Sequence, residues 1–193
     1  MKRKILIING HPDPAPERYC GALSKRYAEA AANAGHEVRS LSIGALDFDL
    51  IRSRYAFEEG DPSSAIAAAQ DQILWADHLV IVHPLWLGAA PALLKGFFEQ
   101  VFRYGFAMPR PGLDAPQGRL RGRSARLIVT MGMPALIYRT VFGAFGVRAM
   151  ARGILRISGI APVRLSLIGQ VEGAPEERRR WLDRVGELGR LGA

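Results

Sequence analysis

Five short runs of branched apolar residues recur along the chain and alternate with stretches of helical periodicity. The apolar runs cover residues 5–8, 38–43, 79–82, 127–129 and 163–168. The helical patterns cover residues 19–34, 61–75, 91–104, 136–157 and 175–191, and glycines interrupt the fourth of them. Apolar runs without polar alternation are typical of strands buried on both faces, and strands that alternate with helices form parallel sheets covered by helices. The sequence therefore predicts a three-layer α/β fold.

Two doubly wound layouts fit such a pattern, the dinucleotide-binding order and the flavodoxin-like order 2-1-3-4-5. Five strands favour the second layout, and we expect residues 1–193 to form one domain. In this order the strand sequence reverses between the first and third strands, so a ligand should bind at the loops that follow them. The loop after the fourth strand should border the same edge of the sheet. Residues 47–60 and 108–123 are predicted to be loops.

Composition restricts the classes of protein to consider. The formal net charge is +8, and arginines gather at 119–126 and 178–180. We expect a solvated basic face rather than a nucleic-acid site, because no aromatic residues interleave and no nucleic-acid motif is present. The single cysteine, Cys20, excludes an internal disulfide and suits a reducing cytoplasm. No apolar run has the length of a membrane helix, so we expect a cytoplasmic protein without integral membrane association.

The three loops at the predicted binding edge have an unusual composition. Residues 10–14 read Gly-His-Pro-Asp-Pro, residues 83–91 read His-Pro-Leu-Trp-Leu-Gly-Ala-Ala-Pro, and residues 130–134 read Thr-Met-Gly-Met-Pro. The second loop is apolar and aromatic, although surface loops are usually polar. The glycine of the third loop allows a close approach of the backbone, with N–H groups to donate. Together the loops favour a flat ring system that carries a phosphate tail.

These loops also carry a family resemblance. Residues 84–102, Pro-Leu-Trp-Leu-Gly-Ala-Ala-Pro-Ala-Leu-Leu-Lys-Gly-Phe-Phe-Glu-Gln-Val-Phe, resemble the signature of the NAD(P)H:quinone oxidoreductase (DT-diaphorase) family of flavodoxin-like flavoproteins. That family includes bacterial modulators of drug activity and ancillary subunits of potassium-efflux systems. Residues 10–14 resemble its first loop, and residues 130–134 with Tyr138 resemble its third.

The resemblance implies a ping-pong reaction in which NAD(P)H gives a hydride to a bound flavin and a quinone or similar acceptor then takes the electrons. It implies FAD, with FMN as the alternative, and a homodimer whose active site uses both subunits. A flavin-binding ancillary subunit of a potassium-efflux transporter is the alternative function. An electron-shuttling flavodoxin is disfavoured, because such proteins are typically acidic.

The resemblance also assigns residues. Cofactor binding falls on His11, Arg18, Tyr19, Gln70, Pro84, Leu85, Trp86, Leu87, Thr130, Met131, Gly132, Met133, Tyr138 and Arg179. Tyr138 and Gly132 are the catalytic candidates. His11 should contact the flavin phosphate, whereas Gln70 and Arg179 should lie at the adenine end, and Gln70 favours FAD. No metal is expected.

The chain departs from the family pattern at two places. Arg18 stands where relatives have a phosphate-binding hydroxyl, and a guanidinium is a suitable replacement. Phe145 or a neighbour stands where some members have a histidine that relays charge with the tyrosine, so that relay is not expected. Structural interpretations remain open for Tyr138 as a core aromatic and for His83 as a hydrogen-bonded strand end. Lys95 is expected to pair with Glu99.

Overall fold

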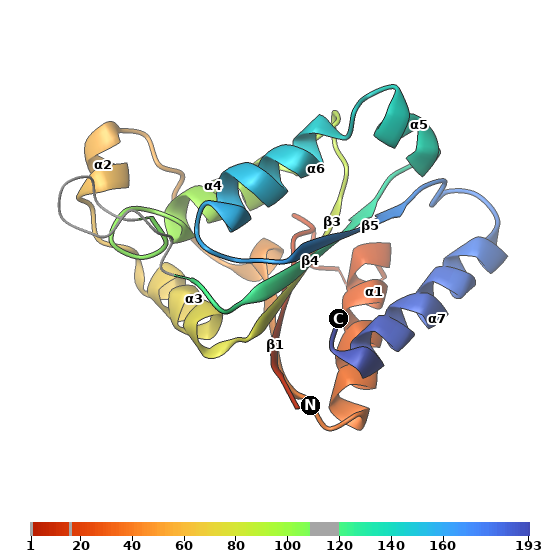
Figure 1. Ribbon diagram of the computed structural model, residues 1–193. Coiled ribbons are helices and arrows are strands. Elements are labelled where there is room, and N and C mark those ends of the chain that lie inside the picture. The colour runs from red at the N-terminus through yellow and green to blue at the C-terminus, as the bar shows by residue number, and fades with distance from the viewer. Residues whose placement is uncertain (1, 16, 109–119) are drawn as a thin grey trace.

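A parallel five-stranded sheet forms the centre of the molecule (Figure 1). The computed structural model describes residues 2–15, 17–108 and 120–193. The strands are β1 (Lys4–Asn9), β2 (Glu37–Ser42), β3 (His78–Pro84), β4 (Ser124–Thr130) and β5 (Val163–Ile168). Their order is β2-β1-β3-β4-β5, and all neighbours are parallel. The predicted flavodoxin-like order is therefore confirmed.

Helices cover both faces of this sheet. They are α1 (Tyr19–Asn33), α2 (Arg54–Glu58), α3 (Ser64–Trp75), α4 (Ala92–Val101), α5 (Ala135–Thr140), α6 (Phe145–Met150) and α7 (Pro175–Leu191), with a 3₁₀ turn η1 (Ile43–Ala45) and a π-helical turn η2 (Ala151–Arg156). Helices α1 and α7 pack on one face, and α3, α4 and α6 pack on the other (Figure 1). The three layers match the expectation.

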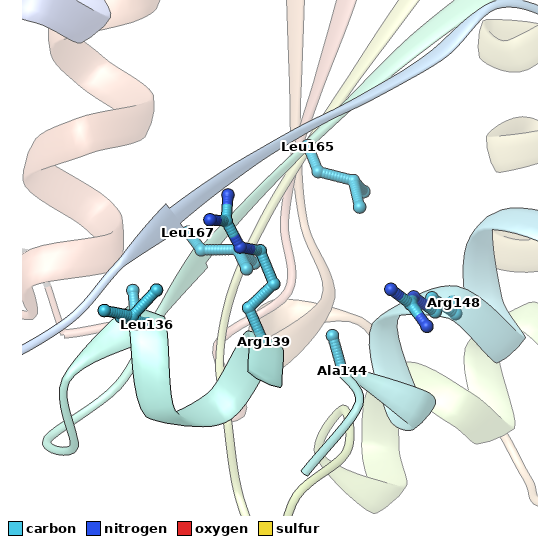
Figure 2. A pocket seen from close by; sticks show the side chains of 7 residues that line it. Leu136, Arg139, Ala144, Arg148, Leu165 and Leu167 are labelled. Carbon is cyan, nitrogen blue, oxygen red and sulfur yellow. The ribbon is translucent and has the colours of Figure 1, made fainter. Parts of the chain in front are cut away.

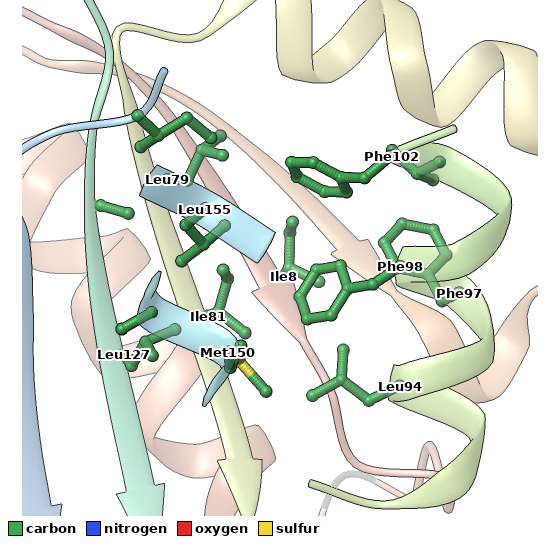
Figure 3. Packing of buried hydrophobic residues seen from close by; sticks show 14 of the residues in the cluster. Ile8, Leu79, Ile81, Leu94, Phe97, Phe98, Phe102, Leu127, Met150 and Leu155 are labelled. Carbon is green, nitrogen blue, oxygen red and sulfur yellow. The ribbon is translucent and has the colours of Figure 1, made fainter. Parts of the chain in front are cut away.

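The strands supply both halves of the core because successive side chains point to opposite faces. Ile5 and Ile7 of β1 pack with α1 and α7, whereas Leu6 and Ile8 pack with α3, α4 and α6. Figure 3 shows Leu94 and the phenylalanines of α4 facing Ile8, Ile81 and Leu127 of the sheet. Burying each such side chain contributes roughly 1.5–3 kcal/mol. The continuous apolar runs of the sequence are explained by this two-sided burial.

Two local expectations were wrong, and one was confirmed. The second long helix begins at Ser64 and not at Asp61, because the hydroxyl of Ser63 accepts the N–H of Ile66 and caps it. Residues 47–60 contain the short helix α2, which Ser53 caps through the N–H of Ala56. The expected glycine interruption of the helical stretch 136–157 is confirmed, because the chain breaks after α5 at Gly143 and Ala144, which both have positive φ.

Some features fall outside the described part of the chain. Residues 109–119 of the predicted loop 108–123 lie there, and so does Arg119 of the basic cluster. Within the described residues, none of the helices has the length and hydropathy needed to cross a membrane. The same residues contain no group of three or more His, Cys, Asp or Glu side chains placed to hold a metal ion.

Candidate functional site

The three predicted loops meet at the carboxyl-terminal edge of the sheet. The N–H of Leu85 donates to the carbonyl of Thr130 at 2.7 Å, which joins the second loop to the third. The ring of His11 meets the ring of Trp86 edge to face, with centroids 6.0 Å apart, which joins the first loop to the second. The fold thus brings together the three loops that the sequence assigned to one site.

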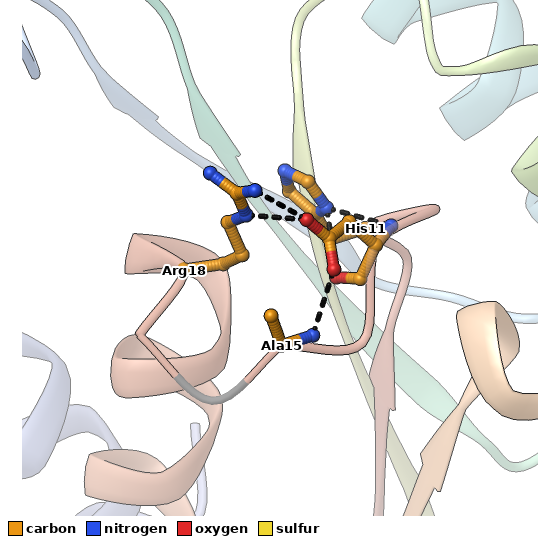
Figure 4. Close-up of polar contacts among 4 residues, drawn as sticks. His11, Ala15 and Arg18 are labelled. Carbon is orange, nitrogen blue, oxygen red and sulfur yellow. Dashed lines mark hydrogen bonds and ion pairs between the residues drawn. The ribbon is translucent and has the colours of Figure 1, made fainter.

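The first loop is held by a carboxylate that sequence reasoning missed. Asp13 Oδ1 accepts the N–H of Ala15 at 2.9 Å, and Asp13 Oδ2 accepts Arg18 Nε at 2.6 Å (Figure 4). His11 Nδ1 lies 3.0 Å from the backbone nitrogen of Asp13. The hydrogen bond from Ala15 and the pairing with Arg18 lower the pKa of Asp13. The loop is therefore pre-formed, with Arg18 held at its rim.

The amino-terminal end of α1 lies beside this loop and has no side-chain cap. Arg18 has extended backbone angles at the N-cap position, and no side chain of the described residues accepts the first N–H groups of the helix. His11 does not cap this helix, because its ring is held by the backbone of Asp13. Free N–H groups at a helix N-terminus form a suitable place for a phosphate group.

The second loop ends in an exposed tight turn. Trp86 and Ala89 exchange both backbone hydrogen bonds, at 2.9 and 3.0 Å. Leu87 and Gly88 between them have φ of 48° and 80°, the pattern of a type I′ turn. Leucine in the left-handed region costs about 1–2 kcal/mol, and Leu87 is 107% exposed. A strained and fully exposed leucine is characteristic of a functional surface rather than of a packing residue.

The third loop combines buried anchors with free donors. Thr130 is buried with its hydroxyl 3.4 Å from the sulfur of Cys20, and the N–H of Met131 donates to Ile168. Gly132 and Met133 follow, and their N–H groups make no hydrogen bond to any part of the chain that the structure describes. A Cβ added at Gly132 would meet nothing closer than Glu172, at 3.8 Å. These two N–H groups are donors available to a bound molecule.

Tyr138 lies behind this edge and not on its surface. Its side chain is 1% exposed, and its hydroxyl donates to the carbonyl of Gly88 at 3.0 Å. The N–H of Val147 approaches the same hydroxyl at 3.4 Å. Burial raises the pKa of Tyr138, so the hydroxyl stays protonated. Tyr138 therefore fastens the Trp86–Ala89 turn to α6.

Three other assigned residues lie around this edge or away from it. The hydroxyl of Tyr19 donates to the carbonyl of Arg178 at 3.0 Å, and burial raises the pKa of Tyr19 to about 12. Arg179 is exposed on the first turns of α7 and pairs with Glu176. Gln70 Nε2 donates to the carbonyl of Val101, at the far end of α4. Tyr19 and Arg179 border the site, whereas Gln70 lies away from the three loops.

The structural interpretations of Lys95 and His83 are both confirmed. Lys95 pairs with Glu99. His83 is buried at the end of β3, with Nδ1 2.8 Å from the carbonyl of Pro84. Burial lowers the pKa of His83 to about 4, so this ring is neutral. Pro84 itself ends β3 and positions Leu85 against Thr130.

A cavity of about 460 Å³ opens next to the third loop, between α5, α6 and β5 (Figure 2). Leu136, Leu165 and Leu167 form its apolar wall, and Arg139 and Arg148 are its cationic side chains. Neither guanidinium group has a hydrogen bond or ion pair to another described residue. Two unpaired cations beside the site raise the local concentration of anionic molecules.

This sheet order, with ligand loops at the point where the order reverses, defines a flavodoxin-like protein. The model of the Flavodoxin_2 family, described as flavodoxin-like fold, matches residues 3–188, and the chain belongs to this family. The resemblance to the NAD(P)H:quinone oxidoreductases is confirmed by relatives that carry that name.

Three curated relatives show which kinds of protein the chain is similar to. A ribosyldihydronicotinamide dehydrogenase-like protein, traD, of Penicillium crustosum is 31% identical over 67% of this chain and 57% of its own length. The chain thus spans little more than half of that relative. NAD(P)H dehydrogenase [quinone] 1 of Rattus norvegicus is 26% identical over 92% of this chain and 72% of its own. The glutathione-regulated potassium-efflux system ancillary protein KefF of an Enterobacter species is 33% identical over 66% and 60%.

Solved structures share the fold. Smu.1420 from Streptococcus mutans is 27% identical with a TM-score of 0.78, over 97% of this chain and 99% of its own. An FMN-dependent NADH-azoreductase from Bacillus anthracis, solved in complex with FMN, is 17% identical with a TM-score of 0.76 over 100% of both chains. At 17% identity the azoreductase demonstrates the common fold alone.

Proposed function

We propose that the protein is a flavin-dependent NAD(P)H oxidoreductase that passes two electrons to a quinone or a similar small acceptor. The observation that carries this proposal is the meeting of three loops with complementary chemistry at one edge of the sheet. The family and the names of the relatives support it independently.

The residues present fit a flavin. The uncapped N-terminus of α1, together with His11 and Arg18, offers donors and positive charge to the phosphate. The exposed turn at Trp86 and Leu87 offers an apolar surface to a flat ring. The unpartnered N–H groups of Gly132 and Met133 offer donors to ring oxygens. Pro84, Leu85, Thr130 and Met131 hold these groups in position.

When bound, the flavin supplies the two-electron chemistry, and the chain supplies binding, orientation and electrostatics. Gly132 and Met133 would hold negative charge that develops on the bound ring, through N–H groups that are already in place. The neutral hydroxyl of Tyr138 would keep the Trp86–Ala89 turn in its strained conformation. Arg139 and Arg148 would attract the phosphates of NAD(P)H, which favours NADPH.

The flavin is proposed to be FAD, with FMN as the alternative. The preference for FAD rests on the family resemblance, which assigns Gln70 and Arg179 to the adenine end, although Gln70 on α3 and Arg179 on α7 lie over opposite faces of the sheet. Gln70 uses its amide nitrogen within this chain, on Val101, so the identity of the flavin has to be measured. Chromatography of the cofactor released from the purified protein distinguishes the two.

We also propose a homodimer in the cytoplasm. Large apolar side chains lie exposed around the 86–89 turn and α6, namely Trp86, Leu87, Ile137, Val141, Phe142 and Phe145. The turn and α6 are in close contact, because a Cβ at Gly146 would lie 2.3 Å from the carbonyl of Gly88. Such a concentration of apolar surface is typical of an interface.

Sedimentation of wild type and variants tests the dimer. Phe145→Asp should yield a monomer at micromolar concentration. Leu191→Asp, at an exposed leucine on α7, is the matched control and should leave the dimer intact. A wild-type monomer would contradict the proposal.

A matched pair of glycine variants tests the proposed flavin site. Gly132→Ala places a methyl group among the free N–H groups, where the backbone has to approach a ring closely. Gly153→Ala is the control, since a Cβ there meets nothing within 4 Å. Gly132→Ala should weaken flavin binding by about tenfold or more, measured by fluorescence titration, and Gly153→Ala should not. Equal affinities would exclude Gly132 from the site.

The KefF relative supports one second candidate, a flavin-binding ancillary subunit of a potassium-efflux transporter. Purified protein that binds flavin, oxidises NAD(P)H with a quinone and does not co-purify with a membrane transporter supports the enzyme. Flavin binding with co-purification of a transporter, and with no turnover, supports the ancillary subunit.

A further inference from the structure

A small cavity lies at the amino-terminal edge of the sheet, opposite the three loops. Its volume is about 70 Å³, and it is lined by Arg3, His78, Ser124, Ala125, Pro162 and Arg164. All of these residues lie at or next to the first residue of a strand, in β1, β3, β4 or β5. Because β3 has seven residues, this cavity is about 20 Å from the proposed flavin site. The cavity is therefore a separate place in the molecule.

Strand alternation gathers positive charge on one side of this edge. Ile5, Val80, Ile128 and Ile168 all pack on the face covered by α1 and α7. A residue that lies two or four positions before one of these in the same strand points to the same face of the sheet. Those residues are Arg3, His78, Arg126 and Arg164, and Arg126 is the register partner of Arg164. Three guanidinium groups and one imidazole thus surround the same corner.

No ion pair between described side chains compensates this charge, and the carboxylate of Asp77 at the same edge accepts the N–H of Lys4 at 3.0 Å. Among the described residues, no carboxylate side chain lies within ion-pair distance of Arg3, Arg126 or Arg164. Arg3 donates to the carbonyl of Gly192, and Arg126 donates to the backbone oxygen of Ala193 and to Ser166. The guanidinium group of Arg164 makes no hydrogen bond to a described residue.

His78 provides an independent sign of a missing partner. The side chain is 2% exposed, and its Nδ1 lies 2.8 Å from the hydroxyl of Ser124. Its Nε2 is buried and has no hydrogen-bond partner. Burial and the three arginines lower the pKa of His78 to about 3. Buried polar atoms without a partner are uncommon and call for an explanation.

We propose that this cavity binds a phosphate ion between Arg3, Arg164 and His78. Guanidinium groups bind tetrahedral oxyanions through paired charge-assisted hydrogen bonds. When the hydroxyl of Ser124 donates to Nδ1 of His78, the proton of the neutral ring is on Nε2, which then donates to a phosphate oxygen. The volume accommodates one small oxyanion and excludes a nucleotide. The site lies outside the proposed electron-transfer site and does not depend on that function.

Thermal unfolding and NMR test the proposal on the purified protein, with excess flavin added so that phosphate does not compete for the first loop. Inorganic phosphate is titrated at constant ionic strength against chloride. Wild type is expected to gain several degrees in Tm in a saturable manner, and the imidazole ¹⁵N signals of His78 should shift over the same concentrations. Arg164→Ala should weaken phosphate binding by about tenfold or more. Arg52→Ala is the control, because it removes an exposed arginine, far from the cavity, whose side chain has no partner among the described residues. This variant should bind phosphate as tightly as wild type.

Two results would overturn the proposal. One is an equal rise of Tm in wild type, Arg164→Ala and Arg52→Ala, which would be a general effect of the salt. The other is an unchanged His78 spectrum at phosphate concentrations that raise Tm, which would place the ion elsewhere.

Discussion

Replacing Tyr138 by phenylalanine tests how the second loop is held. The change deletes the hydroxyl that joins the Gly88 carbonyl, at 3.0 Å, to α6. It leaves that carbonyl without its partner and removes the weaker contact with Val147, at 3.4 Å. Losing one such buried hydrogen bond costs about 1–2 kcal/mol. For a domain of this size, we expect a fall in Tm of about 3–6 °C in the flavin-free protein.

The flavin affinity should fall as well, for an indirect reason. The left-handed conformation of Leu87 costs about 1–2 kcal/mol, and the hydroxyl of Tyr138 helps to maintain it. A turn that is free to relax is competent to bind only part of the time, which weakens the apparent affinity by about five- to tenfold. Adding flavin should therefore restore less stability to the variant than to wild type.

Differential scanning fluorimetry and flavin titration measure both effects, with Tyr55→Phe as the control. Tyr55 is exposed, and its hydroxyl has no partner among the described residues. The reasoning is refuted if flavin-free Tyr138→Phe is as stable as Tyr55→Phe. A loss of flavin affinity without a loss of stability would mean that the hydroxyl contacts the bound molecule directly.

Other predictions concern the first loop, the buried His78 and the single cysteine, Cys20. Arg18→Ala should weaken flavin binding by about tenfold or more, because a charge-assisted hydrogen bond to the phosphate is lost. Arg18→Lys should weaken flavin binding less. If wild type and Arg18→Ala bind flavin equally well, the phosphate is held by His11 and the backbone alone. The pKa of His78 is about 3 in the folded protein and near 6.5 in the unfolded chain, so its contribution to stability is present above pH 6.5 and is lost as the pH falls toward 3. Between pH 6.5 and 4.5 in chloride buffer, the free energy of unfolding of His78→Asn should therefore fall by about 2–3 kcal/mol less than that of wild type. Urea unfolding measures this difference. Equal falls in the two proteins would contradict a neutral buried imidazole. Burial raises the pKa of the Cys20 thiol to about 11, so a disulfide reagent at pH 8 should label the native protein at least about a hundredfold more slowly than the unfolded chain; rapid native labelling would show that the thiol is accessible.

The fold was predictable because its signals are local and repeated. Five apolar runs gave the strands, and strand number with the helix alternation gave the order. Helix boundaries were less predictable. The segment Asp61-Pro62-Ser63-Ser64 offers several capping side chains in succession, and only the structure selects Ser63. The five residues of α2 are too few to display a helical period.

The meeting of the three loops at the candidate site was predictable from the strand order, which reverses at this edge. The partners of individual side chains were not, because they depend on contacts between segments distant in sequence. Tyr138 meets Gly88 across 50 residues, and Gln70 meets Val101 across 31. The pair of Asp13 with Arg18 is nearer, and an acidic residue five positions before the arginine was its only signal.

The central claim is that the edge formed by the three loops binds a flavin and uses it to move electrons from NAD(P)H to a small acceptor. The most direct measurement is the steady-state rate of NADPH oxidation by flavin-loaded protein, with NADPH varied at several fixed concentrations of a quinone. We predict turnover that requires the flavin, and parallel lines in the double-reciprocal plot because donor and acceptor use the same place in turn. Protein that binds no flavin, or that binds flavin but does not oxidise NADPH or NADH in the presence of quinone, would contradict it.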